Sequence, residues 1–283
     1  MPPLAAAVAA ALGCEVARIT PVTGGCISEA GRVDLADGRT VFAKSGAGLP
    51  AELLAVEAEG LRWLGEVEGV PVPEVEAVTA DALVLTWLPP GPSGPGTDEA
   101  VGRALAALHR AAVPAFGWHR DGFIGREPQR NTPTSSSWPG FWFDRRIGPL
   151  VDRAVRRGAL DPRARGLADR LRTGLADRAG PAEHAVRVHG DLWSGNVHVD
   201  AAGRPWLVDP APYGGHREVD LAMLHLFGDP GPRCVAAYEE ARPLADGWRD
   251  RMELWQLEPL LNHAAMFGGG YGASALAVLR RWS

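Results

Sequence analysis

The sequence predicts an α+β protein with two lobes: a small β-sheet lobe with one helix, then a mainly helical lobe. Short apolar runs and turn signals fill the first 88 residues around one helical stretch. A segment rich in proline and glycine, 89–96, interrupts this pattern, and helical spacing dominates most of the remaining chain. With 283 residues the chain is long enough for lobes at 1–88 and 89–283 that share a cleft.

Turns and apolar spacing define the elements of the N-terminal lobe. The apolar start, 1–13, lacks a basic region and is too short to cross a bilayer, so it predicts a helix rather than a signal peptide. Residues 33–44 predict two strands joined at Asp37-Gly38, a dipeptide typical of hairpins. Leucines at helical spacing predict a helix over 51–65. Further strands are expected within 70–78 and 81–88.

Helical signals dominate the second lobe. Asp98 is suited to cap a helix over 101–111, and a tryptophan-rich loop over 118–143 leads into helices that extend to about residue 179. Short apolar runs return between 186 and 209. From Glu218 onward the pattern is helical again, so a small β-hairpin region is expected within the helical lobe.

Composition narrows the classes of partner. The net charge of −5 and a pI near 5.9 exclude the general basic field that attracts nucleic acids or anionic membranes. Cys14, Cys26 and Cys234 show no CxxC spacing, which argues against a disulfide scaffold or a cysteine zinc site. We therefore expect a cytoplasmic protein, a monomer or weak dimer, whose partner is a small molecule.

The segment 188–210 contains the most informative spacing in the chain. Asp191 and Asn196 lie five residues apart between two strand-like runs, and Asp209 follows thirteen residues later. Phosphoryl transfer requires a carboxylate that accepts the proton of the attacking hydroxyl, and oxygen ligands for Mg²⁺. The spacing predicts Asp191 as the base, with Asn196 and Asp209 as metal ligands, as in the H-R-D-x-x-x-x-N loop of protein kinases. The alternative is a polar turn in which Asp and Asn serve only as turn residues.

Two upstream residues fit the same scheme. Lys44 ends the second strand of the predicted hairpin, and Glu57 lies in the following helix, with Glu59 as a less suitable substitute. A kinase site needs such a lysine on the α/β-phosphates and a glutamate to hold it. Taken singly, each could be an ordinary solvated surface residue.

Backbone groups for a nucleotide are expected at two places in the N-terminal lobe. Glycines in the first turn allow backbone N–H groups to approach phosphates; the candidates are Gly24, Gly25, Cys26, Ile27 and Ser28. The chain that leaves the last strand offers backbone groups to an adenine edge at Thr86, Trp87 and Leu88. A thiol close to phosphate-binding N–H groups would have a lowered pKa, so oxidation of Cys26 is a hypothetical off-switch for nucleotide binding.

These motifs together resemble the fructosamine kinase or ketosamine-3-kinase family, which is similar to aminoglycoside phosphotransferases and protein kinases. The matching segments are GGCISEA at 24–30, FGWHRDGFIG at 116–125, VHGDLWSGNV at 188–197, VDPAPYGGHREVDLAM at 208–223 and LLNHAAMFGGGY at 260–271. The resemblance implies a protein-kinase-like fold with a nucleotide-binding first lobe and a catalytic, substrate-binding second lobe. It also implies transfer of phosphate from ATP, with Mg²⁺, to the 3-hydroxyl of a ketoamine, or glycated amine, whose product then releases the amine.

Five residues are candidates for binding such an acceptor. Trp138 and Trp193 could form an apolar wall, while His216, Glu218 and Asp220 offer polar groups to a cationic, hydroxylated substrate. The structural alternatives are core packing for the tryptophans, a hydrogen-bonded loop histidine, and a buried support of the catalytic loop for Asp220.

Other functions remain open from the residues alone. The same motifs would serve a kinase for an aminoglycoside, a ribulosamine or a free sugar, because they position a hydroxyl without selecting the molecule that carries it. A pseudoenzyme that binds nucleotide as an interaction module is a second alternative. A hydrolytic metal site at His189, Asp191, His198 and Asp209 is a third, although the chain has no H-E-x-x-H motif.

Overall fold

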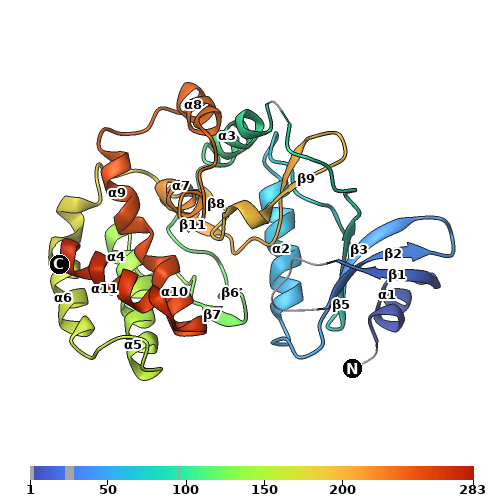
Figure 1. Ribbon diagram of the computed structural model, residues 1–283, viewed down its shortest axis with the longest axis horizontal. Helices are drawn as coiled ribbons and strands as arrows, with labels where there is room; N and C mark the ends of the chain where they lie inside the picture. The colour runs from blue at the N-terminus through green and yellow to red at the C-terminus, as the bar shows by residue number, and fades with distance from the viewer. Residues whose placement is uncertain (1–2, 23–28, 95) are drawn as a thin grey trace.

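The computed structural model describes residues 3–22, 29–94 and 96–283. A sheet lobe and a helical part lie side by side along the long axis of the molecule (Figure 1). Within the described residues the lobe holds a five-stranded antiparallel sheet of order β1-β2-β3-β5-β4. The strands are β1 Val16–Pro21, β2 Ala30–Leu35, β3 Thr40–Ser45, β4 Val75–Val78 and β5 Ala82–Thr86. The α+β class is therefore confirmed.

Alternating burial places the two faces of this sheet against two helices. In β2 and β3 every second residue is buried, and these apolar side chains pack with those of α1, Leu4–Leu12. On the opposite face, β5 packs against α2, Leu53–Gly65. The hairpin turn at Gly38 has a φ of 88°, which glycine adopts without strain. The lobe thus carries two helices where the predicted fold class had one, because the N-terminal helix also packs on the sheet.

The helical part begins after a connection that follows β5. Its first helix is α3, Thr97–Leu108, where Asp98 lies in the first turn and Gly96 takes the cap position, contrary to the expected Asp98 cap. The other helices are α4 Trp138–Trp142, a π-helix Phe143–Ile147, α5 Gly148–Arg156, α6 Ala164–Arg178, α7 Glu218–Leu224, α8 Pro232–Ala241, α9 Trp248–Trp255, α10 Leu257–Phe267 and α11 Gly270–Trp282.

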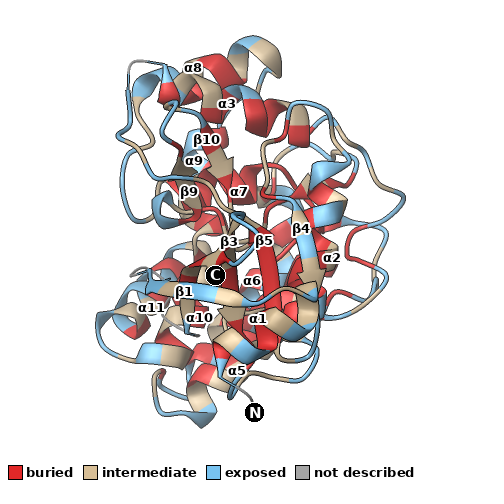
Figure 2. Ribbon diagram, turned by 90° about the vertical axis from the view of Figure 1, so that its right-hand side faces the viewer, coloured by how far each residue is buried: buried red, intermediate tan, exposed pale blue. Residues whose placement is uncertain are grey.

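Short strand pairs connect these helices and carry the motifs. They are β6 Gly122–Ile124 with β7 Glu127–Gln129, β8 Val186–Val188 with β11 Tyr213–Gly215, and β9 Val197–Val199 with β10 Pro205–Leu207. Buried residues, red in Figure 2, occur in strands and helices of both the sheet lobe and the helical part. The interior of the helical part is aromatic: Trp142 and Trp255 meet edge to face with ring centroids 5.0 Å apart. The tryptophan-rich loop therefore contributes much of its side-chain volume to the core.

Two features of the whole chain remain to be described: its longest apolar helices and the boundary between its lobes. Among the described residues, no helix is long and apolar enough to cross a membrane. The lobe boundary near residue 88 remains a prediction.

Candidate active site

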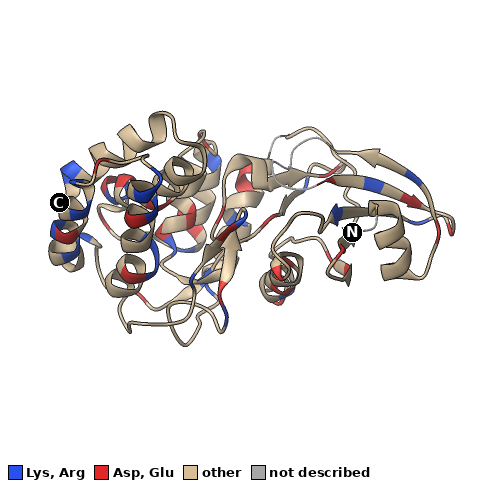
Figure 3. Ribbon diagram, turned by 90° about the horizontal axis from the view of Figure 1, so that it is seen from below, with Lys and Arg blue, Asp and Glu red and all other residues tan. Residues whose placement is uncertain are grey.

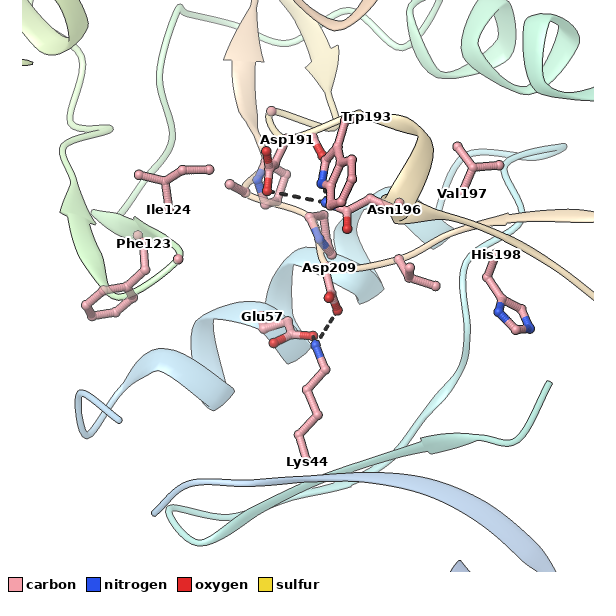
Figure 4. A pocket seen from close by; sticks show the side chains of 18 of the residues that line it. Lys44, Glu57, Phe123, Ile124, Asp191, Trp193, Asn196, Val197, His198 and Asp209 are labelled. Atoms are coloured by element: carbon pink, nitrogen blue, oxygen red, sulfur yellow. Dashed lines mark hydrogen bonds and ion pairs between the residues drawn. The ribbon is translucent and has the colours of Figure 1, made fainter. Parts of the chain in front are cut away.

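The sheet lobe contributes a buried lysine to the cleft. Lys44 lies on β3, where alternation directs Val41 and Ala43 to the α1 side and leaves Lys44 on the other face. Its Nζ is 2.7 Å from Oε1 of Glu57 on α2, and it also contacts Oδ1 of Asp209 (Figure 4). Burial opposes the charge, but the two carboxylates together raise the pKa of Lys44 above its usual value. The lysine is therefore held as a cation between the two parts of the molecule.

The carboxylate of Asp191, the predicted base, follows β8 and faces the same cleft. Nδ2 of Asn196 donates to the backbone oxygen of Asp191 at 2.8 Å and lies 3.3 Å from its Oδ2. Burial, together with the negative charges of Asp209, Asp220 and Glu258, raises the pKa of Asp191 to about 7. A carboxylate with that pKa is suited to accept a proton near neutral pH.

Behind Asp191 the loop is fastened by fully buried groups. Asp220 on α7 accepts hydrogen bonds from the backbone N–H groups of His189, at 2.6 Å, and Gly190, at 2.9 Å. Nε2 of His109 is 3.1 Å from the same carboxylate. Although burial opposes ionisation, these contacts lower the pKa of Asp220. Asp220 therefore supports the loop, which is the structural alternative noted for it, even though it also borders the cavity.

His189 positions the loop without acting as a base. Burial lowers the pKa of His189, so the ring is neutral. Its Nδ1 accepts from the backbone N–H of Asp191 at 3.3 Å, and its Nε2 donates to the backbone oxygen of Val208 at 3.0 Å. The residue between His189 and Asp191 must be glycine. Gly190 has a φ of 81°, and a Cβ there would lie 2.1 Å from the backbone oxygen of Ala211. The histidine thus ties the catalytic loop to the chain that leads into Asp209.

Asp209 and Asn196 form a donor set that fits Mg²⁺. The Asp209 side chain is 43% exposed to the cavity, and its φ of 53° is unusual for a residue other than glycine. Since Nδ2 of Asn196 donates to Asp191, its Oδ1 remains for a cation. One carboxylate and one amide oxygen are hard ligands of the kind that hold Mg²⁺ against nucleotide phosphates. The strained backbone is typical of a functional site rather than of an ordinary turn.

The alternative hydrolytic metal site is not supported. His198 is occupied by a hydrogen bond between its Nε2 and the backbone oxygen of Leu88, 2.9 Å long. His189 is likewise engaged with Val208. Across the described ranges, no group of three or more His, Cys, Asp or Glu side chains could hold a metal ion.

These groups converge on one cavity of about 940 Å³ between the sheet lobe and the helical part. Lys44, Glu57, Asp191, Asn196 and Asp209 all line it. The three predicted adenine-edge residues also line it: Thr86, Trp87 and Leu88. The backbone oxygen of Leu88 already accepts a hydrogen bond from His198. This bond holds the chain that follows β5 against β9. The volume is within the range of sites for nucleotide-sized ligands.

One predicted segment cannot be compared with this cavity. Gly24, Gly25, Cys26, Ile27 and Ser28 lie outside the described residues. The phosphate loop and the redox role of Cys26 both remain predictions.

The five candidate acceptor residues divide between the cavity and the core. Trp193 lines the cavity, and its ring centroid is 6.0 Å from that of Phe227. Trp138 is only 4% exposed and packs among aromatic rings in the core. His216 is stacked between Trp138 and Trp255, at 6.0 and 5.7 Å.

Glu218 is also withdrawn from the cavity. Its carboxylate receives two hydrogen bonds from Arg251, at 2.9 and 2.6 Å, and one from Trp255 at 2.8 Å. Like Trp138 and His216 it is buried and lies outside the cavity lining. These three residues are therefore placed to support the site rather than to touch an acceptor.

Two segments that sequence reasoning left without a role form much of the cavity wall. They are the β6–β7 hairpin, with Phe123, Ile124 and Gln129, and α10, with Glu258, Asn262, His263, Met266 and Phe267. The motifs that carry the family resemblance, FGWHRDGFIG and LLNHAAMFGGGY, include β6 and most of α10, but not β7 with Gln129 and not Glu258. That resemblance was the available signal, because local spacing does not show that a C-terminal helix returns to the cleft.

The cleft between the sheet lobe and the helical part holds a lysine–glutamate pair, a loop carboxylate and an Asn/Asp donor set. This combination of fold and site defines the kinase-like phosphotransferases. The fold has counterparts among solved structures: an aminoglycoside phosphotransferase crystallised with ADP and hygromycin B has a TM-score of 0.62 at 17% identity, with 98% of each chain covered. At that identity the likeness shows the fold.

Closer relatives identify the family. A family model for fructosamine kinase matches residues 4–282, and the chain belongs to the fructosamine kinase family. A candidate fructosamine-3-kinase from Thermobifida fusca has a TM-score of 0.91 at 41% identity, covering 99% of this chain and 98% of its own. A probable ketoamine kinase from Enterococcus faecium is 32% identical over 268 residues, 94% of this chain and 95% of the relative. The chain is thus a phosphotransferase of a family that acts on hydroxyl acceptors.

Proposed function

We propose that this enzyme transfers the γ-phosphoryl group of ATP to the 3-hydroxyl of a fructosamine, and that the breakdown of the product frees the amine. The observation that carries the proposal is Asp191, a carboxylate with a pKa of about 7 in the same cavity as the cationic Lys44 and the Asn196/Asp209 donor set. The family supplies the ketoamine as the acceptor class. We propose deglycation of amines in the cytoplasm as its role.

Asp191 accepts the proton of the acceptor hydroxyl in the proposed reaction. As that hydroxyl oxygen forms a bond to the γ-phosphorus, the bond from this phosphorus to the β,γ-bridging oxygen breaks and ADP leaves. Asn196 orients Asp191 through the 2.8 Å contact to its backbone oxygen. Because Asp220 and His189 hold the loop from behind, the carboxylate needs little reorganisation before the proton moves.

Lys44 would bind the α- and β-phosphates. The charge of Lys44 is balanced by Glu57 and Asp209. With a nucleotide bound, Glu57 would hold the ammonium in place, and Asp209 and Asn196 would hold Mg²⁺. The metal ion would neutralise charge on the phosphate oxygens during transfer.

The test is a coupled ADP-release assay with Mg-ATP and a panel of acceptors: a fructosamine, a ribulosamine, free fructose and an aminoglycoside. NMR of the product then locates the phosphorylated carbon. Phosphate on carbon 3 of the fructosamine supports the proposal. Turnover only with another acceptor would keep the kinase and discard the deglycation role, and no turnover with any acceptor would favour the pseudoenzyme.

A further inference from the structure

A second cavity lies beside the acceptor end of the cleft. Its volume is about 560 Å³, and its walls come from β7, the π-helix, α5 and α10. Four residues line both cavities, so the two spaces meet at one shared wall: Ile124, Gln129, Glu258 and Asn262. A π-helix, here Phe143–Ile147, is rare and is often found at functional sites. The phosphoryl transfer proposed at Asp191 makes no use of this space.

The lining of the second cavity is rich in arginine: Arg130, Arg145, Arg146, Arg153 and Arg156. Lys and Arg residues are also more frequent on the helical part than on the sheet lobe (Figure 3). The two aspartates in the lining, Asp144 and Asp152, are engaged by arginines at 3.0 and 2.6 Å. Both carboxylates are therefore already ion-paired, Asp144 with Arg172 and Asp152 with Arg165, which lie outside the lining.

The guanidinium charges in this cavity are not fully compensated. Arg130 and Arg156 line the cavity and are exposed, and among the described residues their side chains have no hydrogen bond or ion pair. Arg153 has one carboxylate partner, Glu127, at 3.2 Å. Burial, and then the neighbouring charges of Arg157, Arg156 and Arg130, lower the pKa of Arg153. Arg146 is paired with Glu258 at 2.9 Å, and both residues line this cavity. Arg130 and Arg156 are thus left without a carboxylate partner among the described residues, which favours a bound anion.

The shared wall provides a second, independent sign of a ligand. Gln129 and Asn262 are each only 5% exposed, and both line the two cavities. Within the described residues, Oε1 of Gln129 and Oδ1 of Asn262 have no hydrogen-bond partner. Leaving a buried amide oxygen without a partner costs free energy, so such groups usually mark the position of a missing ligand or water.

We propose that the second cavity is an anion subsite that binds the carboxylate of an acceptor whose sugar lies at Asp191. This inference rests on the proposed function and specifies its substrate class: ketoamines of amines that carry a carboxylate, such as amino acids and acidic peptides. Guanidinium groups bind carboxylates with strong, directional hydrogen bonds. The amides of Gln129 and Asn262 lie between the sugar position and the arginines, where they would bind polar atoms of the connecting chain.

Matched acceptors test the preference in the native enzyme. The acceptor Nα-acetyl-Nε-fructosyl-lysine carries a carboxylate far from the sugar, and fructosyl-glycine carries one close to it; each is compared with its carboxamide. We expect kcat/KM to favour at least one carboxylate over its amide by about tenfold at low salt, with the ratio falling as salt screens the charges. The pair of acceptors that shows the preference indicates how far the subsite lies from Asp191. A ratio near one for both pairs would overturn the subsite.

Variants assign the preference to the cavity. In R130Q/R156Q the carboxylate-to-amide ratio should fall to about one, because two unpaired charges are removed. The matched control is R170Q/R280Q, which removes two charges from exposed positions outside both cavities and should keep the native ratio. A native ratio in R130Q/R156Q would refute the assignment. If none of the four acceptors received phosphate on carbon 3, the proposed function would be overturned, and the subsite with it.

Discussion

The front and the back of the catalytic loop hold carboxylates in opposite states. Asp191 at the front faces the cavity, has Asn196 as its side-chain partner, and has a pKa raised to about 7. Asp220 at the back is 1% exposed, receives two backbone hydrogen bonds and a histidine, and has a lowered pKa. The tryptophans show the same contrast: Trp193 lines the cavity and Trp138 is in the core. Asp191, which faces the cavity, thus has fewer hydrogen-bond partners than Asp220 behind it.

The largest effect is expected when Asp191 is replaced, and it should fall on activity and not on stability. Asp191→Asn should lower kcat by about 10² to 10⁴ because it removes the general base. A carboxyl whose pKa is raised by folding destabilises the folded state once it ionises, so above pH 7 the variant should unfold at equal or higher urea concentration. Steady-state kinetics and urea denaturation at pH 8 check both results. An active Asp191→Asn enzyme would remove the distinction between front and back.

The opposite result is expected behind the loop. Asp220→Ala should lower the free energy of unfolding by about 3–5 kcal/mol, because it leaves buried donors of the loop unpaired. The conservative control is Asp220→Asn, which retains one acceptor oxygen and should lose less. Urea denaturation measures both variants. If Asp220→Ala were as stable as the native enzyme, the support described for the loop would be wrong.

The pKa values of Asp191 and Asp220 also predict how activity depends on pH. Since the base must be ionised, kcat/KM should fall about tenfold for each pH unit below pH 7. Asp220, with its lowered pKa, should add no limb between pH 5 and 8. A pH profile with a saturating concentration of Mg-ATP checks this expectation. An acid limb near pH 4 would show that Asp191 is not the group that limits the reaction.

The smallest expected effect concerns the tryptophans. Trp193→Ala should raise KM for the acceptor by roughly tenfold with little change in stability, since it removes one aromatic face from the cavity wall. Trp138→Ala should instead lower the free energy of unfolding by about 3–5 kcal/mol through a core cavity. Kinetics with a single ketoamine and parallel urea denaturation compare the two. Equal stability losses would mean that Trp193 is also a core residue.

The sequence was a good guide to which distant residues lie together. Lys44, Glu57, Asp191, Asn196 and Asp209 were singled out from spacing, and the structure brings all of them to one cavity. Phosphoryl transfer demands particular side chains in a particular chain order, so a short pattern can carry much of the geometry. Their roles at a nucleotide stay predictions.

The acceptor side was predicted less well. Trp138, His216 and Glu218 were candidates because of residue type and nearness to the motifs, yet packing turns them into the core. The contribution of the β6–β7 hairpin and α10 depends on contacts between segments more than a hundred residues apart, such as Trp142 with Glu258. No local pattern encodes such a contact.

The sequence by itself determined the α+β class and the family, because periodicity, turn chemistry and motif order are local properties of the chain. The roles of Lys44, Asp191, Asn196 and Asp209 in phosphoryl transfer stay predictions. Only the tertiary structure decided which carboxylates are saturated, which tryptophans reach the cavity and that an arginine-lined cavity adjoins the acceptor site. Those properties arise from burial and from the sum of neighbouring charges, and both depend on segments that only folding brings together.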